Sequence, residues 1–312
     1  MESIDDPILT LALINAAIAV KHETAEMHEI LRLSQWAIDL AGGDASMGGE
    51  VATSTPLAFA IAFRGLARWC LGMSGWRDDF RHAIAMVGSA ESVSHSGVLY
   101  YTRTMAMLHG VVLSDDTTVR AMAEILTRTE HSGEDVTYGL AKSNVAFALL
   151  HGADESQRPY ALELLRQIRD LAVRRRYSRT AIPMVDTYLA HDRIRNGDLD
   201  AAIELARTAV DEEIDCSGVI FAPMATSVLV EALLRRGREE DLAEAQSAVN
   251  RLDAVETEPG LVLYDIWLAK MRAQLAQAQN DGAQYRDLRD RYRRMATELG
   301  FEGHMAWADA MA

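Results

Sequence analysis

Six glycines recur at nearly even intervals along this 312-residue sequence, each between two segments of helical apolar periodicity. They are Gly72, Gly110, Gly152, Gly197, Gly237 and Gly282, separated by 38, 42, 45, 40 and 45 residues. A repeat of about 20 to 50 residues is typical of a solenoid, because one such unit is too small to bury its own apolar face. The spacing therefore predicts stacked helix–turn–helix units with a glycine at each corner.

Two corners show the pattern most clearly. Ala206–Val210 recurs as Ala245–Val249, 39 residues further on, and arginines stand just before Gly197 and Gly237. Glycine past the last helical turn adopts the left-handed conformation at little cost, and basic residues there interact favourably with the negative end of the helix dipole. We expect one helix to end at each of these corners.

The periodicity predicts an all-α solenoid of about seven antiparallel helix pairs and a C-terminal helix, forming a single domain over residues 1–312. Only six prolines interrupt the chain, and no alternating apolar–polar run indicates a strand. We expect more than about two thirds of the residues to be helical. A Gly-rich segment, residues 41–55, is predicted to be a flexible connector after the first pair. The expected pairs are Pro7–Val20 with Thr24–Ala41, then Pro56–Val87, Ser96–Glu130, Asp135–Arg175, Arg179–Glu213, Phe221–Ala254 and Gly260–Leu299, followed by Gly303–Met311.

The net charge of the chain limits the classes of molecule that it can bind. The sequence has 31 Lys+Arg against 46 Asp+Glu, a net charge of −15, which disfavours direct binding to nucleic acid or anionic membranes. The apolar run Ile8–Val20 follows acidic residues and is too short to span a bilayer. Asp6 and Pro7 instead predict an N-cap and a first helical position. We expect a cytoplasmic protein.

Motifs of common enzymes are missing. The sequence has no GxxxxGK, GxSxG, HExxH or GxGxxG segment, so we expect no catalytic residue, no cofactor and no metal. His22 and His28 are six residues apart, which places them on opposite sides of a helix. Cys70 and Cys216 lack zinc-site spacing and are predicted to be buried thiols.

Three clusters have both a structural and a functional interpretation. Arg174–Arg176 with Arg179 fits either a helix C-terminus or a site for an anion or acidic partner. The acidic residues Asp211–Asp215 are interpreted as a solvated helix end. Trp69, Trp76 and Phe80 fit the core better than a contact surface.

The segment Tyr292–Ala308, YRRMATELGFEGHMAWA, resembles the end of mycobacterial and actinobacterial signalling proteins that join an adenylate cyclase domain, an AAA-type (STAND/LuxR-type) ATPase and a helical-repeat region. Residues 56–72 and 76–80 resemble the same family. The resemblance implies a non-catalytic regulatory tail that senses a ligand or partner, with a cyclase or ATPase module as one partner. Cyclase metal-binding aspartates and ATPase phosphate loops have no counterpart here. An excised region and a stand-alone gene product both remain open.

The chain also resembles tetratricopeptide repeats, although its period is longer than their 34 residues. In that architecture, positions about ten and six residues before the corner glycine line the concave groove. Counting ten residues back from Gly282 places Arg272 at such a position. The candidate groove residues for a protein, peptide or small-molecule ligand are Tyr100, Lys142, Thr187, His191, Ser227 and Glu231.

Two classes of function follow. The first is a sensor or protein-interaction scaffold, which includes a peptide-sensing repeat regulator. The second is a hydrolase-like enzyme whose site is assembled from distant residues such as His191 and Glu231.

Overall fold

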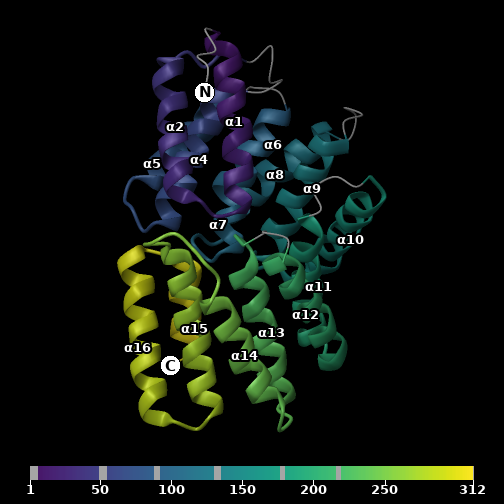
Figure 1. Ribbon diagram of the computed structural model, residues 1–312. Helices are drawn as coiled ribbons and strands as arrows, with labels where there is room; N and C mark the ends of the chain where they lie inside the picture. Colours follow the sequence, from purple (N-terminus) through teal and green to yellow (C-terminus); the bar gives the residue numbers. More distant parts are fainter. Residues whose placement is uncertain are drawn as a thin grey trace. The chain divides into compact units, whose positions relative to one another are not determined.

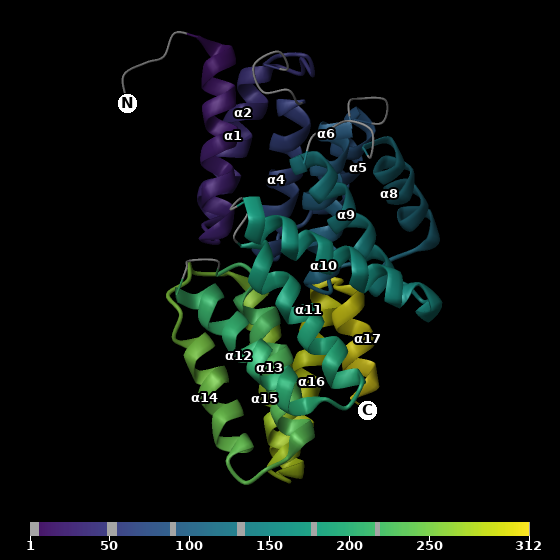
Figure 2. The ribbon, with the colours of Figure 1, turned by 90° about the vertical axis from the view of Figure 1, so that its right-hand side faces the viewer.

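A computed structural model describes residues 6–48, 55–87, 92–129, 135–175, 180–215 and 219–311. The chain is 81% helical and has no strand in these ranges, which confirms the all-α solenoid-like fold and its expected helix content. Successive helices pack in antiparallel pairs (Figure 1, Figure 2).

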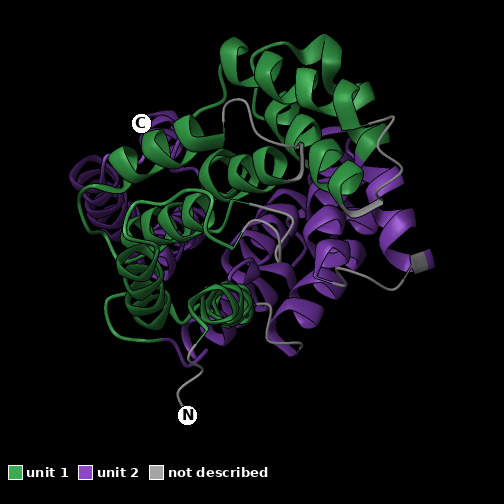
Figure 3. Ribbon diagram, turned by 90° about the horizontal axis from the view of Figure 1, so that it is seen from above, with its two compact units in different colours: residues 1–108, 113–164, 258–261 green, residues 109–112, 165–257, 262–312 purple. Residues whose placement is uncertain are grey.

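The helices form two compact units (Figure 3). Unit 1 comprises residues 1–108, 113–164 and 258–261, and unit 2 comprises residues 109–112, 165–257 and 262–312.

Unit 1 contains the first helix pairs. Its elements are α1 (Pro7–Glu23), α2 (Met27–Ala41), α4 (Pro56–Cys70), α5 (Trp76–Val87), α6 (Ser92–Leu99), the π-helical turn η1 (Tyr100–Thr104), α7 (Met105–Leu108), α8 (Asp116–Thr129), α9 (Asp135–Leu150), the short 3-10 helix η2 (Glu155–Gln157) and the start of α10 (Arg158–Arg175). Helix α1 begins as predicted, because the Asp6 side chain accepts hydrogen bonds from the backbone N–H groups of Ile8 and Leu9. Of the predicted connector, residues 49–54 lie outside the described ranges.

The core of unit 1 holds the aromatic residues that the sequence assigned to it. Trp69, Trp76 and Phe80 are buried, and so is Cys70, whose thiol pKa is raised by burial. Cys216 lies outside the described residues. Asp79, also buried, accepts hydrogen bonds from Arg64 and Arg68 of the preceding helix.

Unit 2 is the more regular unit. It contains the pairs α11 (Ala181–Arg195) with α12 (Leu199–Asp215), α13 (Ala222–Arg236) with α14 (Asp241–Asp253), and α15 (Val262–Ala278) with α16 (Gly282–Leu299), followed by α17 (Glu302–Ala310). The first helices of successive pairs pack against one another, α11 with α13 and α13 with α15. Equivalent positions of successive repeats are therefore neighbours, as in a solenoid.

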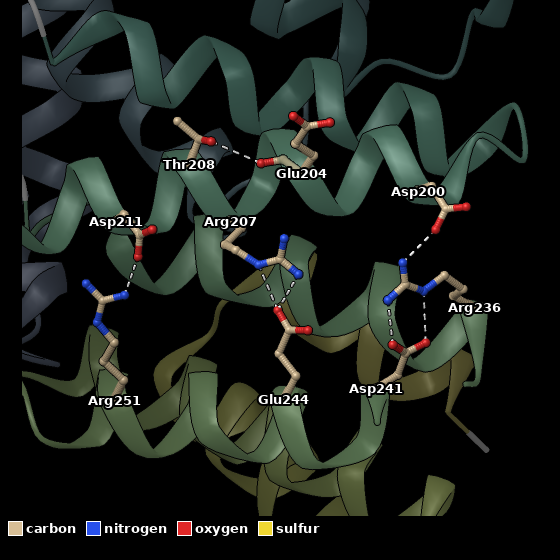
Figure 4. A network of polar contacts seen from close by, with 9 residues as sticks. All are labelled: Asp200, Glu204, Arg207, Thr208, Asp211, Arg236, Asp241, Glu244 and Arg251. Atoms are coloured by element: carbon tan, nitrogen blue, oxygen red, sulfur yellow. Dashed lines mark hydrogen bonds and ion pairs between the residues drawn. The ribbon is translucent and has the colours of Figure 1, made fainter. Parts of the chain in front are cut away.

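Ion pairs connect the second helices α12 and α14 of unit 2 (Figure 4). Arg207 donates to Glu244 at 2.9 and 2.7 Å, and Arg251 pairs with Asp211 and Asp215. Arg236, at the end of α13, bridges Asp200 of α12 and Asp241 of α14 at 2.6 Å each. Partners on α12 and α14 are about one repeat apart in sequence, as stacking requires.

Of the two charged clusters singled out in the sequence, the acidic one needs a correction and the basic one stays open. The acidic residues at the end of α12 are not simply solvated, because Asp211 and Asp215 pair with Arg251 and Glu213 is buried. Arg174 pairs with Asp170 four residues earlier, at 3.1 Å, while Arg176 and Arg179 lie outside the described residues.

Four predicted corner glycines have positive φ, but Gly152 and Gly282 do not. Gly237 caps α13 at φ 69°, and its N–H donates to the carbonyl of Leu233. At the next corner Asn280 takes the left-handed conformation at φ 58°, because asparagine tolerates it better than other side chains do. Gly282 instead begins α16 after the N-cap Asp281. The corner therefore lies two residues earlier than the glycine predicted.

Candidate ligand-binding site

The corrected corner changes which residue of α15 is equivalent to the predicted groove residues. Thr187 and Ser227 stand ten residues before the corner residues Gly197 and Gly237. Ten residues before Asn280 the chain has Lys270, whereas the count from Gly282 gave Arg272. Arg272 is exposed and pairs with Asp253 at 2.7 Å. Lys270 is the residue that sequence reasoning missed, and an asparagine treated as a corner residue would have found it.

Lys270 and Ser227 are in direct contact. The Lys270 ammonium donates to Ser227 Oγ at 3.1 Å where α13 and α15 pack together. Ser227 is buried, and so is Thr187, whose hydroxyl donates to the carbonyl of Pro183 within α11. The two hydroxyls predicted to line a groove are therefore inside unit 2, and Lys270, which is partly exposed, is the polar residue of this row that reaches solvent.

The second row lies one helical turn further along the same helices. His191 of α11 and Glu231 of α13 are partly exposed, and His191 Nε2 lies 3.9 Å from Glu231 Oε2. Arg235, four residues after Glu231, pairs with the same carboxylate at 2.9 Å. On α15 the equivalent residue is Gln274, six residues before Asn280. Its buried Oε1 atom has no hydrogen-bond partner among the described residues.

Two indoles flank the Lys270 ammonium. Its nitrogen lies 4.8 Å from the ring centroid of Trp267 and 4.6 Å from that of Trp307, within the range of cation–π attraction. Within the described ranges it donates to Ser227, and no carboxylate there lies within 4.0 Å of it. An ammonium has three N–H donors, so two have no acceptor among these residues. The buried Nε1–H of Trp267 likewise has none.

Helix α17 holds Trp307 in place through a contact between two glycines. The N–H groups of Glu302 and His304 donate to the carbonyls of Val111 and Gly110, at 3.0 and 3.1 Å. A Cβ on Gly303 would lie 2.8 Å from the α-carbon of Gly110, and a Cβ on Gly110 would lie 2.6 Å from the Trp307 ring. Only glycine allows this approach.

His304 packs against the two indoles, Trp267 and Trp307, that flank Lys270. It is fully buried between Trp267 and Trp307 and forms a 2.8 Å hydrogen bond with the Tyr292 hydroxyl through Nδ1. Burial holds the pKa of His304 well below its ordinary value, and the nearby Lys270 charge lowers it further. The ring is therefore uncharged at neutral pH and leaves Lys270 as the cation of the cluster.

Burial also sets the protonation of Lys270. It lowers the pKa of the ammonium to about 8, and the negative charge of Glu231 only partly opposes this shift. At neutral pH the residue is still mostly protonated. The cluster thus presents a partly desolvated positive charge that has no carboxylate within 4.0 Å among the described residues.

The two remaining candidates belong to unit 1. Tyr100 begins the π-helical turn η1 and packs edge-on against Tyr101. The ammonium of Lys142, on α9, lies 4.1 Å from the ring centroid of Tyr138. The two residues thus have different aromatic neighbours, and their assignment to a groove stays a prediction.

Comparisons with known proteins do not name a family for the chain. A scan against protein-family models finds no match, and a search of curated proteins finds none either. Within the described residues, no group of three or more His, Cys, Asp or Glu side chains is placed to hold a metal ion. No helix among them is both long enough and apolar enough to cross a membrane.

Proposed function

We propose that unit 2 binds a ligand carrying a carboxylate or phosphate group, and that Lys270 contacts this group. The observation that carries the proposal is the Lys270 ammonium, which is flanked by Trp267 and Trp307 and has no carboxylate partner among the described residues. Cations that lose much of their hydration are normally paired or hydrogen-bonded within the protein. An anionic ligand would supply the missing acceptors.

The surroundings restrict the ligand further. The net charge of −15 repels anions at long range, so recognition depends on short-range contacts rather than on electrostatic steering. The indole faces of Trp267 and Trp307 favour an apolar or aromatic body next to the anionic group. Ligands with a single anionic group on an apolar body fit these conditions.

Benzoate and phenyl phosphate test the proposal, with neutral benzamide as the ligand control. Isothermal titration should give saturable binding of one or both anions and none of benzamide. Lys270→Gln should weaken binding about 10- to 100-fold, the value of a charge-assisted hydrogen bond. Lys142→Gln is the matched control, because it also removes an ammonium lying over an aromatic ring. Equal binding by wild type and Lys270→Gln would rule the site out.

The 3.1 Å distance between Ser227 Oγ and Lys270 Nζ favours a second function, the hydrolase-like alternative. A lysine with a pKa of about 8 is partly neutral near neutral pH, and a neutral amine can take the proton of a serine hydroxyl that attacks an ester. A fluorophosphonate probe should then label Ser227, and p-nitrophenyl acetate turnover should disappear in Ser227→Ala. Absence of both label and turnover would reject this alternative.

At the cellular level we propose a non-catalytic sensor or interaction scaffold in the cytoplasm. The resemblance of Tyr292–Ala308 to the tails of cyclase–ATPase regulators supports this role, because Trp307 and His304 of that segment build the Lys270 cluster. A peptide ligand ending in a carboxylate belongs to the same proposal. Native mass spectrometry of the protein purified from its host tests it: a co-purifying anionic ligand, or a cyclase or ATPase module, would support the role. A protein that carries neither would count against it.

A further inference from the structure

Helix α1 of unit 1 has two apolar faces on opposite sides. Its buried face consists of Leu11, Ile14, Ile18 and His22, which pack toward α2 and α4. The opposite face presents Leu9, Leu13, Ala16 and Val20, spaced by four, three and four residues. Leu9, Leu13 and Val20 are 42%, 48% and 66% exposed. This spacing is that of a coiled-coil seam, in which apolar residues recur every 3.5 residues on average.

The outer face of α1 is unusually apolar for an exposed helix face. From Pro7 to Val20 the helix has no charged residue. Its two most polar side chains make internal bonds, since Thr10 donates to the Asp6 carbonyl and Asn15 to the Pro56 carbonyl. A helix face that remains in water normally carries charged or polar side chains. An exposed apolar seam with coiled-coil spacing therefore indicates a surface that another helix covers.

The acidic residues at the two ends of the seam indicate which kind of binding partner can cover it. Asp6 lies three residues before Leu9, and Glu23 lies three residues after Val20, so an acidic residue stands at each end of the seam. The Glu23 side chain is 37% exposed: its Oε2 atom is buried and its Oε1 atom lies 3.6 Å from His22 Nδ1. Neither has a lysine or arginine within ion-pair distance among the described residues. A second copy of α1 in register would bring like charges together in either orientation. In a parallel pair Asp6 would lie next to Asp6 and Glu23 next to Glu23, and in an antiparallel pair Asp6 would lie next to Glu23. An anionic lipid surface would also repel them.

We propose that this outer face docks an amphipathic partner helix whose apolar seam has the same four–three spacing and is bracketed by lysine or arginine. Leucine–alanine–valine packing supplies the contact, and the basic ends pair with Asp6 and Glu23. The net charge of the whole chain, −15, also favours association with a basic partner. The proposal concerns unit 1 and does not depend on the Lys270 site.

A designed, fluorescein-labelled 21-residue helical peptide with a Leu/Ala seam and arginines at both ends tests the proposal by fluorescence anisotropy. Wild-type protein should bind it saturably. Leu13→Glu should weaken binding at least tenfold without changing the circular dichroism spectrum or melting temperature, because Leu13 is already half exposed. Met73→Glu, at an equally exposed apolar residue of unit 1, should bind like wild type. A second peptide with glutamates at the ends should bind at least tenfold more weakly than the first.

Several outcomes would overturn this assignment. They are no binding of the basic peptide, binding unaffected by Leu13→Glu, and equal binding of the acidic peptide. Sedimentation velocity over a concentration series would reveal a dimer abolished by Leu13→Glu, which would make a second copy the occupant. Phosphatidylcholine/phosphatidylserine vesicles that bind wild type but not Leu13→Glu, with no peptide binding, would make lipid the occupant.

Discussion

Units 1 and 2 are built from the same kind of helix pair, yet they differ in how regularly the pairs repeat. In unit 2 the left-handed corner residues Gly197, Gly237 and Asn280 are 40 and 43 residues apart, and the first helices are unbroken α-helices. In unit 1 the third pair has a first helix interrupted by the π-helical turn η1. Uninterrupted helices keep equivalent positions in rows, whereas a π-turn, with its i to i+5 bonds, shifts every later residue around the helix axis.

Buried polar groups accompany the irregular helix. Thr104 Oγ1 donates to Asn144 Oδ1 at 2.7 Å, and Asn144 Nδ2 donates to the Ser96 carbonyl at 2.8 Å, so Asn144 of α9 connects α6 with the end of η1. In unit 2 the ion pairs between repeats lie mainly on exposed second helices, and the polar contacts between first helices include Lys270 with Ser227 and His191 with Glu231. Unit 1 uses its interior polar groups to fix the fold, while unit 2 keeps a cation that its described residues do not pair with a carboxylate.

The largest expected difference between the units concerns close glycine contacts. Gly303→Ala would place Cβ 2.8 Å from the α-carbon of Gly110, a backbone atom that cannot turn away, and should destabilise unit 2 by about 3 kcal/mol. Gly97→Ala in unit 1 meets the far end of the Phe59 ring at 2.5 Å, which can rotate, and should cost less. Hydrogen-exchange mass spectrometry, read separately on α15–α17 and α4–α6, checks both. Gly282→Ala, with nothing within 4 Å, is the control.

Each unit has a buried aspartate paired with arginine near the start of a second helix, and breaking either pair is the next largest effect. Asp241→Asn and Asp79→Asn should each cost about 2 to 3 kcal/mol at pH 7, because each removes a buried negative charge from arginine. Arg236 keeps only the exposed Asp200, and Arg64 and Arg68 lose the carboxylate that they share. Hydrogen bonding to Arg236 lowers the pKa of Asp241. The stabilisation is therefore present above the unfolded pKa of about 4 and is lost as pH falls through the lower folded pKa.

Urea unfolding of wild type and Asp241→Asn between pH 2 and 7 measures this dependence. The two stabilities should converge as the solution becomes acidic. A gap that stays constant down to pH 2 would show that the carboxylate charge does not stabilise the pair.

The stability of unit 2 should also depend on Lys270 at alkaline pH. Below pH 8 the residue is charged in both states, and the folded state bears the cost of its desolvation. Between the folded pKa of about 8 and the ordinary value of about 10.5 the unfolded chain binds the extra proton, so stability should rise with pH relative to Lys270→Met. We expect a relative gain of about 1 kcal/mol or more between pH 7.5 and 9.5. If the free energy of unfolding changed with pH in the same way for wild type and Lys270→Met, the pKa of Lys270 would not be lowered in the folded state.

The exposed ion pairs between repeats should contribute least. A double-mutant cycle of Arg207→Gln and Glu244→Gln should give a coupling of about 0.2 to 1 kcal/mol, because both side chains are partly solvated. The coupling should shrink at 1 M NaCl. A coupling above about 2 kcal/mol, unaffected by salt, would mean that these pairs hold the repeats of unit 2 together.

Sequence reasoning predicted helices well because their signals are local. Asp6 with Pro7 starts α1, Gly237 ends α13, and the apolar spacing of the pairs follows from helix geometry. Counting back from Gly197 and Gly237 gives His191 and Glu231, which are 40 residues apart and are neighbours in unit 2; their place in a groove stays a prediction. The same count failed on α15, where Asn280 rather than Gly282 turns the corner and Lys270 replaces Arg272.

Other parts of the candidate site depend on contacts that no local pattern encodes. The approach of Gly303 to Gly110 joins segments almost two hundred residues apart, and it is this contact that brings Trp307 to the Lys270 ammonium. Tyr100 was predicted as a groove residue because it stands ten residues before the corner Gly110. The π-helical turn η1 lies between these two residues, so the α-helical periodicity that the ten-residue rule assumes does not hold over this segment. Burial of Thr187 and Ser227 likewise follows from packing against neighbouring repeats.

The most direct test uses the fact that the sequence contains only three lysines, Lys21, Lys142 and Lys270. Protein labelled with ¹³Cε-lysine should show three signals by NMR, assigned with the variants Lys142→Arg and Lys270→Arg. On titration with benzoate or phenyl phosphate, the Lys270 signal should shift saturably while the other two stay in place, and benzamide should shift none. Three signals that move together, or a Lys270 signal that does not move with either anion, would contradict the assignment of Lys270 as the ligand-binding cation.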